Sequence, residues 1–142
     1  MAPKTRVQRT DDRRLRTDNR GKEMIKSYED LEVFQKAYKV SLEIHKLSLE
    51  ISQMEQRSLA DQLRRSSKSV CVNLAEGFGK QSHSRQEFKK YLSICIGSAD
   101  ETKVWLKYTR DLKYFSEDKS NELIQEYTNI AKMLSGLYKN WG

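Results

Sequence analysis

The sequence predicts an all-α protein, an antiparallel up-down-up-down bundle of four helices. Apolar residues recur at helical spacing in four separate segments of the chain. Short polar stretches separate these segments, and no segment alternates apolar and polar residues as a half-buried strand does. Four helices of about 18 residues or more, joined by short loops, pack as a bundle of this kind.

The first predicted helix runs from about residue 29 to residue 50, and Ser27 or Asp30 is its expected cap. Its apolar residues form two stripes, which are Leu31, Phe34, Tyr38, Leu42, His45 and Leu49, and Val33, Ala37, Val40, Ile44, Leu47 and Ile51. Together they make an arc wider than one neighbouring helix needs. The helix therefore lies between two partners in the bundle or turns part of the arc toward another subunit.

The second predicted helix covers residues 58–76. Its apolar stripe is Leu59, Leu63, Ser67, Val70, Leu74 and Phe78, with Cys71 beside it. Gly77 and Gly79 are expected to stop this helix, because glycine readily takes the left-handed conformation that closes helices.

The third predicted helix is long, covering residues 85–114, with Ser82 or Ser84 as its cap. Its stripe is Phe88, Leu92, Cys95, Ala99, Thr102 and Leu106. Three small residues follow one another at Gly97-Ser98-Ala99. Glycine inside a helix costs about 1 kcal/mol relative to alanine, so we expect it to allow a neighbouring backbone to approach.

Ser116, followed by Glu117 and Asp118, is expected to open the fourth helix. The stripe of this helix is Leu123, Tyr127, Ile130, Leu134, Leu137 and Trp141. The 4-3-4-3-4 spacing is typical of helices that pack at a shallow angle.

The length and the distribution of charge indicate one domain preceded by a basic arm. A chain of 142 residues fits one domain, and the net charge of +7 favours a polyanionic partner. Residues 1–26 hold nine basic and four acidic side chains, a net charge of +5, which leaves +2 for the predicted bundle at 27–142. The basic N-terminal arm has few apolar residues and is predicted to be disordered. Alternatively, translation begins at Met24 rather than Met1.

The sequence offers little chemistry. His83 has no obvious local partner, His45 lies in an apolar stripe, and Cys71 and Cys95 lie in helical patterns. There is no metal-ligand spacing and no phosphate-binding glycine loop. We expect neither an enzyme nor a resident metal or cofactor. No apolar run is long enough to span a membrane and no signal peptide is evident, so the cytoplasm is the expected compartment.

Basic residues cluster in three places. The clusters are Arg64, Arg65 and Lys68; Lys80, Arg85, Lys89 and Lys90; and Lys103, Lys107, Arg110 and Lys113. Tyr91, Trp105, Tyr108 and Tyr114 are interleaved with them. Lysine and arginine neutralise phosphates and exposed aromatic rings stack on unpaired bases, which indicates nucleic-acid binding. The alternative is an ordinary solvated face, with some cations paired to acids such as Asp100, Glu101 or Asp111.

Several motifs resemble a known family. They are Ser27-Tyr28-Glu29-Asp30-Leu31-Glu32-Val33, Leu59-Ala60-Asp61-Gln62-Leu63-Arg64-Arg65-Ser66, Asn73-Leu74-Ala75-Glu76-Gly77-Phe78-Gly79 and Gly97-Ser98-Ala99-Asp100-Glu101. Over residues 27–140 the chain resembles the bacterial four-helix bundle proteins encoded in intervening sequences of 23S ribosomal RNA genes. A related branch comprises the accessory proteins of diversity-generating retroelements, which serve a reverse transcriptase and its template RNA.

The resemblance implies a homopentameric ring of antiparallel bundles without a catalytic site. The positions that match the family's motifs are Arg65, Asn73, Glu76, Gly77, Gly97, Ser98 and Glu101. Asn73 and Glu76 are expected to hydrogen-bond toward the third helix, and Gly97 and Ser98 to permit close packing. Two functions stay open: binding of nucleic acid, in particular structured RNA, and a protein-interaction scaffold such as an accessory subunit of a reverse transcriptase.

Overall fold

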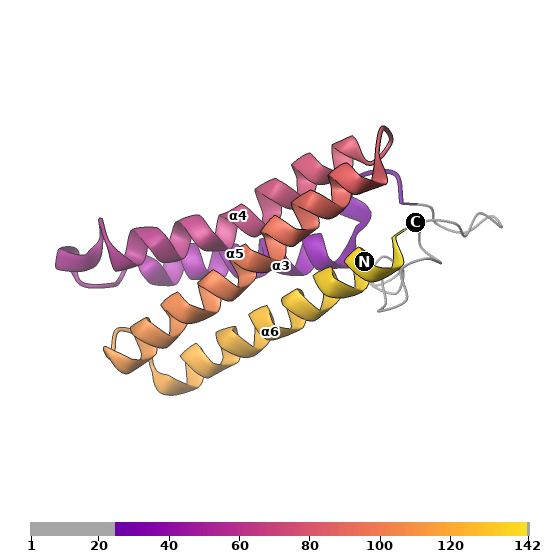
Figure 1. Cartoon of the computed structure of the whole chain (residues 1–142). Helices are drawn as coiled ribbons and strands as arrows, with labels where there is room; N and C mark the ends of the chain where they lie inside the picture. The colour runs from indigo at the N-terminus through magenta and orange to yellow at the C-terminus, as the bar shows by residue number, and fades with distance from the viewer. Residues whose placement is uncertain (1–24, 142) are drawn as a thin grey trace.

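The computed structural model describes residues 25–141, and every regular element among them is helical. The long helices are α3 (Glu32–Ser48), α4 (Leu59–Lys80), α5 (Arg85–Asp111) and α6 (Glu117–Asn140), as Figure 1 shows. The 3-10 turns η1 (Tyr28–Asp30) and η2 (Gln53–Glu55) precede α3 and α4. The predicted all-α fold with four helices is confirmed.

Two further predictions concern the N-terminal arm and membrane-spanning segments. All but the last two residues of the predicted N-terminal arm, 1–26, lie outside the described residues. Within residues 25–141, no helix combines the length and the apolar character that crossing a membrane would require.

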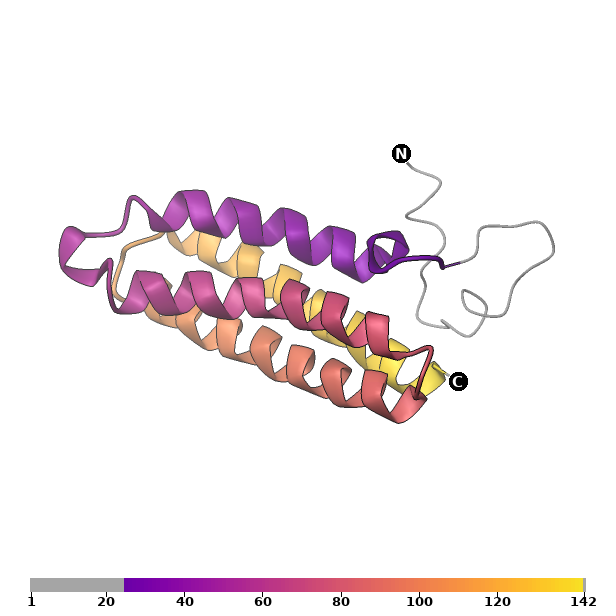
Figure 2. The same cartoon turned by 90° about the horizontal axis from the view of Figure 1, so that it is seen from above.

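Each long helix packs against the next one along the chain, and α6 also contacts α3. The packing is most extensive between α4 and α5 and least extensive between α3 and α6. In Figure 2 the α3–α4 and α5–α6 connections lie at one end of the molecule and the α4–α5 turn lies at the other. Helix α4 therefore lies between α3 and α5, and α6 closes the arrangement on the opposite side.

The core follows the predicted stripes. The fully buried large side chains include Phe88, Leu92 and Leu106 of α5 and Leu123, Tyr127, Ile130, Leu134 and Leu137 of α6. Burial of each such side chain contributes about 1.5–3 kcal/mol. At the end near the α4–α5 turn, Trp141 meets Phe78 and Phe88 edge to face, with ring centroids 6.1 Å and 5.0 Å away.

The second of the two stripes predicted for the first helix lies largely in the bundle, with Leu47 half-buried. Val33, Ala37, Val40 and Ile44 are buried, whereas Tyr38, Leu42 and Leu49 of the other stripe are exposed. The wide arc of α3 therefore leaves a row of apolar residues on the surface of the chain.

Serine side chains cap two of the long helices, α5 and α6. Ser84 Oγ accepts a hydrogen bond from Glu87 N at the start of α5, and Ser116 Oγ accepts one from Lys119 N at the start of α6. Ser27 caps the short turn η1 and not α3, because Leu31 is extended (φ −76°, ψ 126°) and separates the two. The first helix therefore begins three residues later than predicted.

The predicted end of the second helix is wrong. Helix α4 continues through Gly77 and Gly79 to Lys80. A Cβ atom at Gly77 would lie 2.3 Å from Tyr91 Cβ, so this glycine lets α5 approach α4 closely. The third helix, by contrast, ends at Asp111, three residues before its predicted end. Lys113 adopts a left-handed conformation there (φ 71°), which turns the chain toward α6.

Candidate nucleic-acid interface

Four of the residues at the family-motif positions, Asn73, Glu76, Gly77 and Ser98, lie along the contact between α4 and α5, which we call the α4–α5 seam. Tyr91 OH donates a hydrogen bond to Glu76 Oε2 (3.2 Å), so Glu76 reaches the third helix as expected. The hydroxyls of Ser69 and Ser98 lie 2.8 Å apart. Asn73 instead donates to the carbonyl (3.0 Å) and hydroxyl (2.9 Å) of Ser69, within its own helix. It supports the seam only through Ser69.

Two motif residues of α5 lie at the surface. A Cβ added at Gly97 would meet no atom within 4 Å, so the expected close approach at Gly97 is not made within the chain. Glu101 Oε2 accepts a hydrogen bond from Trp105 Nε1 (3.0 Å) one turn further along. Both residues lie on an exposed row with Ile94, Val104 and Tyr108. We call this row the α5 outer stripe.

The first predicted basic cluster divides into different roles. The guanidinium of Arg64 donates to Ser48 Oγ (2.7 Å) and to the side chain (3.2 Å) and carbonyl (3.0 Å) of Gln56. Arg64 therefore fastens the α3–α4 connection. Arg65 is exposed and pairs with Asp61 (2.9 Å). This cluster offers less free charge than the sequence indicates.

The third member of that cluster, Lys68, lies 2.9 Å from His45 Nδ1 on α3. The pKa of His45 is lowered, first by loss of solvation and then by the charges of Lys68 and Arg64. A neutral imidazole accepts the hydrogen bond that the ammonium donates. The pair links α3 to α4 at the surface.

The second predicted cluster surrounds the α4–α5 turn. Lys80 and Arg85 are exposed at the ends of their helices. Lys89 Nζ lies 5.2 Å from the ring centroid of Tyr138 on α6, within the range of a cation–π contact. The cluster thus connects directly with α6.

The third predicted cluster lies on the side of α5 that faces α6. Lys103 Nζ is 3.4 Å from Asp100 Oδ1, and Lys107 is exposed. Arg110 donates to Asp111 (2.8 Å) and, across to α6, to Asn121 (3.0 Å). The hydrogen bond from Arg110 is the main cause of the lowered pKa of the Asp111 carboxyl.

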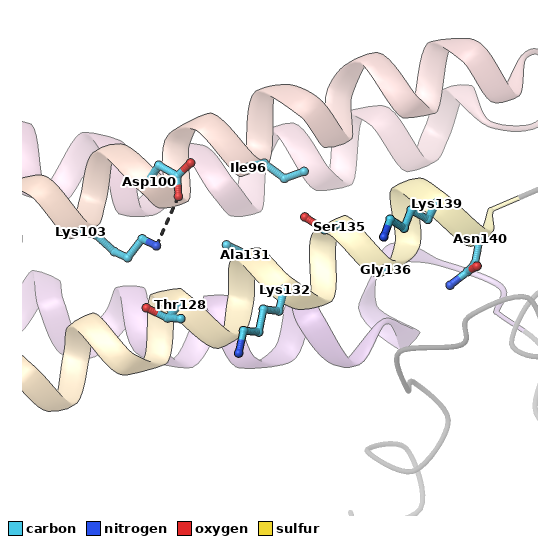
Figure 3. Close-up of a pocket in the computed structure, with 10 residues that line it drawn as sticks. All are labelled: Ile96, Asp100, Lys103, Thr128, Ala131, Lys132, Ser135, Gly136, Lys139 and Asn140. Atoms are coloured by element: carbon cyan, nitrogen blue, oxygen red, sulfur yellow. Dashed lines mark ion pairs between the residues drawn. The ribbon is translucent and has the colours of Figure 1, made fainter.

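An open groove of about 800 Å³ runs between α5 and α6 (Figure 3). Ile96, Asp100 and Lys103 line it from α5, and small residues of α6, among them Ala131 and Gly136, leave it hollow. The other lining residues are Thr128, Lys132, Ser135, Lys139 and Asn140. Three lysines against one aspartate give the lining a net charge of +2.

The sequence reasoning missed Lys132 and Lys139. They lie on α6, whose pattern we used only to find its apolar stripe. They are seven residues apart, so about 10 Å separates their positions along the helix. The signal that marks them is the set of small residues between and beside them, because small side chains beside long lysines leave space on a helix surface.

A second groove of about 410 Å³ lies on the other side of α6, against α3. Four glutamates and two lysines give its lining a net charge of −2; the charged residues are Glu32, Lys36, Lys39, Glu43, Glu122 and Glu126. Salt bridges cross it from Lys36 to Glu126 (2.6 Å) and from Lys119 to Glu43 (2.8 Å). The two grooves that flank α6 therefore have opposite charge.

The thiols lie in the core between the helices. Burial raises the pKa of Cys71 to about 11 and that of Cys95 to about 12. Cys95 Sγ donates to the carbonyl of Val70 (3.4 Å) across the α4–α5 seam. Among residues 25–141, no three His, Cys, Asp or Glu side chains are grouped so as to hold a metal ion.

Comparisons with known proteins agree with this architecture. The model of the family described as 23S rRNA-intervening sequence protein matches residues 29–136. A crystal structure of a protein of unknown function from the S23 ribosomal protein family of Bacteroides thetaiotaomicron superimposes with a TM-score of 0.66. It is 24% identical, and the match covers 75% of this chain and 98% of that chain, so it shows the fold. A search of curated proteins finds no match.

Proposed function

The chain belongs to the 23S rRNA-intervening sequence protein family, and from that premise we propose that it is a non-enzymatic, oligomeric bundle that binds structured RNA. The groove between α5 and α6 is the proposed contact surface. The observation that carries the proposal is the gathering of Lys103, Lys132 and Lys139 in one open groove.

The physical support is the distribution of charge on either side of α6. Lysines that neutralise phosphates release condensed counterions, which supplies much of the affinity of proteins for nucleic acid. The lining of the α5–α6 groove has a net charge of +2, whereas that of the α3–α6 groove has −2, which Lys119 beside Glu43 reduces to −1. The contrast favours one side of the bundle as the RNA surface.

Other predicted contacts extend this surface in different degrees. Lys107 and Arg110 continue the groove toward the α5–α6 connection, and Lys89 continues it toward the α4–α5 turn. Arg64 is engaged inside the fold by Ser48 and Gln56, so we place it outside the proposed interface.

The test is binding of a fluorescent structured RNA, followed by anisotropy across a salt series. We expect the double charge reversal Lys132→Glu and Lys139→Glu to weaken binding at least tenfold and to flatten the salt dependence. The matched control is Lys39→Glu with Lys46→Glu, two exposed lysines seven residues apart on α3. Equal effects of the two double variants would overturn the choice of groove.

The contribution of the N-terminal arm to RNA binding is measured separately. Residues 1–26 have a net charge of +5, so they attract RNA wherever they lie. A chain that begins at Met24 is expected to keep the salt dependence that the groove confers. If only the full chain binds RNA, the contact surface is the N-terminal arm, and the proposal that the α5–α6 groove binds RNA is wrong.

A second candidate function is a protein-interaction scaffold, such as an accessory subunit of a reverse transcriptase. The observation that favours it is the α5 outer stripe, in which Ile94, Val104 and Tyr108 are each about half exposed beside the open Gly97. With Gly97 and Glu101 between them, the stripe has a 3-4-3-4 spacing, which suits another helix. Capture of a protein partner from a nuclease-treated lysate, lost in the variant Val104→Glu, would support this candidate.

The same stripe and the exposed residues Tyr38, Leu42 and Leu49 of α3 support self-association. We therefore include in the proposal the family's homopentameric ring of antiparallel bundles. Light scattering of the purified chain gives the number of subunits. A mass of five chains that falls to one in the variant Leu42→Glu is the expected result, and a monomer at micromolar concentration would contradict the ring.

A further inference from the structure

We propose that the α5–α6 groove takes an unpaired segment of the RNA, with its phosphates on Lys132 and Lys139 and one base stacked on the ring of Tyr138. This inference rests on the proposed function and names the form of RNA that the same site accepts. Two observations carry it, namely an exposed aromatic ring next to Lys139 and the uncharged polar groups that line the groove.

The groove is open along the surface between α5 and α6, so an RNA strand can reach its lining. The groove is hollow along α6 because Ala131 and Gly136 carry little or no side chain, as Figure 3 shows.

The aromatic residue beside the groove is Tyr138, next to Lys139 in the last two turns of α6. Its side chain is 41% exposed. Lys89 Nζ, from α5, lies 5.2 Å from the ring centroid and holds the ring between the two helices. A ring in this position offers its exposed part to a base, and stacking requires that the base be unpaired.

Other aromatic residues are turned elsewhere. Trp105 bonds to Glu101, and with Tyr108 it belongs to the outer side of α5, away from α6. Tyr91 bonds to Glu76 at the α4–α5 seam. Tyr138 is therefore the ring that the fold places beside the lysines.

Uncharged polar groups complete the lining. The hydroxyl of Ser135 is exposed in the groove, and Thr128 lies one turn from Ala131. Such groups suit ribose hydroxyls and base edges, which a single strand presents and a duplex largely hides. Lys132 and Lys139 lie about 10 Å apart along the helix axis, which places them on different phosphates.

The experiment compares a fluorescein-labelled single-stranded oligoribonucleotide with a hairpin duplex of equal nucleotide number, using the full chain. We expect the single strand to bind more tightly. Tyr138→Leu is expected to weaken binding of the single strand at least fivefold and to leave the duplex unchanged. Tyr138→Phe keeps the ring and is expected to restore the affinity.

The salt series separates stacking from charge. Tyr138→Leu leaves the slope of log K against log salt unchanged, whereas Lys139→Gln lowers its magnitude by about 0.7. Circular dichroism and thermal melting of each variant establish that the bundle is folded.

The outcomes distinguish this inference from the function on which it rests. If Tyr138→Leu binds both RNAs as the natural chain does, or weakens both equally, the stacking site is wrong while groove binding of RNA stands. Preference for the duplex would likewise overturn it. If neither RNA binds, the proposed function fails and this inference fails with it.

Discussion

Small residues have opposite effects on the two sides of α5: they allow close packing against α4 and leave an open groove beside α6. On the α4–α5 seam, Gly77 lies against Tyr91 and two serine hydroxyls, of Ser69 and Ser98, meet at 2.8 Å. On the α6 side, Ala131 and Gly136 line an open groove with Ile96, Asp100 and Lys103 of α5. A small residue closes a contact when a bulky partner fills its space, and it leaves a groove open when long, solvated side chains stand beside it.

This difference separates the part of the molecule that holds the fold from the part that is accessible to a ligand. The seam carries buried side chains and hydrogen bonds, among them that between Ser69 and Ser98 and that from Tyr91 to the Glu76 carboxylate. The groove carries charges that the fold does not need. Variants that change contacts inside the fold should therefore alter stability, and variants that change the groove should alter RNA binding.

The largest effect is expected at the tightest point of the seam. Gly77→Ala puts a Cβ atom 2.3 Å from Tyr91 Cβ, which no side-chain rotation relieves. We expect the free energy of unfolding to fall by about 2–3 kcal/mol, measured in urea. Gly97→Ala is the control, since it meets no atom within 4 Å and is expected to stabilise the helix by about 0.5–1 kcal/mol. Equal stability of the two variants would show that the seam is not tight.

Arg64 tests whether a cation belongs to the fold or to the ligand surface. Arg64→Met removes three hydrogen bonds to Ser48 and Gln56. We expect unfolding to become easier by about 1–2 kcal/mol, with RNA affinity at low temperature unchanged. Lys132→Gln is expected to lower the affinity for RNA and to leave the free energy of unfolding unchanged. If Arg64→Met binds RNA more weakly under conditions in which it is fully folded, Arg64 belongs to the RNA interface.

A milder change at the seam is Ser98→Ala. It removes the hydrogen bond between Ser98 and Ser69, while Asn73 still donates to Ser69. The free energy of unfolding is expected to fall by about 0.5–1.5 kcal/mol. Thermal melting gives the effect on stability and anisotropy the effect on RNA binding, which should be none. A weaker RNA complex would mean that the seam and the groove are coupled.

The smallest effect is expected on the α3–α6 side, where exposed ion pairs replace close packing. The pKa of Lys119 is raised, chiefly by its hydrogen bond with Glu43 and then by that with Glu122. Because the folded pKa lies above the ordinary value of about 10.4, the stabilisation is complete below that value and is lost as pH rises through the folded pKa. The melting temperature of the natural chain should exceed that of Lys119→Gln slightly at pH 8, and the gap should narrow as the pH rises through the raised pKa of Lys119. A gap that widens with pH would refute the pairing.

The sequence predicted the helices better than their ends. Ser84 and Ser116 were identified as caps because their signal is local. Gly77 was misread as a helix stop, since a glycine that closes a helix and one that admits a neighbour look alike in sequence. The extended Leu31, which separates η1 from α3, has no distinct local signal either.

The candidate site was predicted in part. Helical spacing placed Lys103, Lys107 and Arg110 in one row, and the structure brings Lys103 to the groove. The partners of Lys103 on α6 were missed, because which side of α6 faces α5 depends on packing. The internal contacts of Arg64 were not predicted for the same reason: Ser48 and Gln56 lie 16 and 8 residues away in the sequence.

The aromatic cluster of Phe78, Phe88 and Trp141 gives the molecule an optical reporter. Trp141 is 3% exposed among these rings, whereas Trp105 is only partly buried beside the α5 outer stripe. Phenylalanine at position 105 would leave a single indole whose emission follows melting of the core. Phenylalanine at position 141 would leave one whose emission follows arrival of a partner on α5. One chain thus supplies separate fluorescence channels for folding and for assembly.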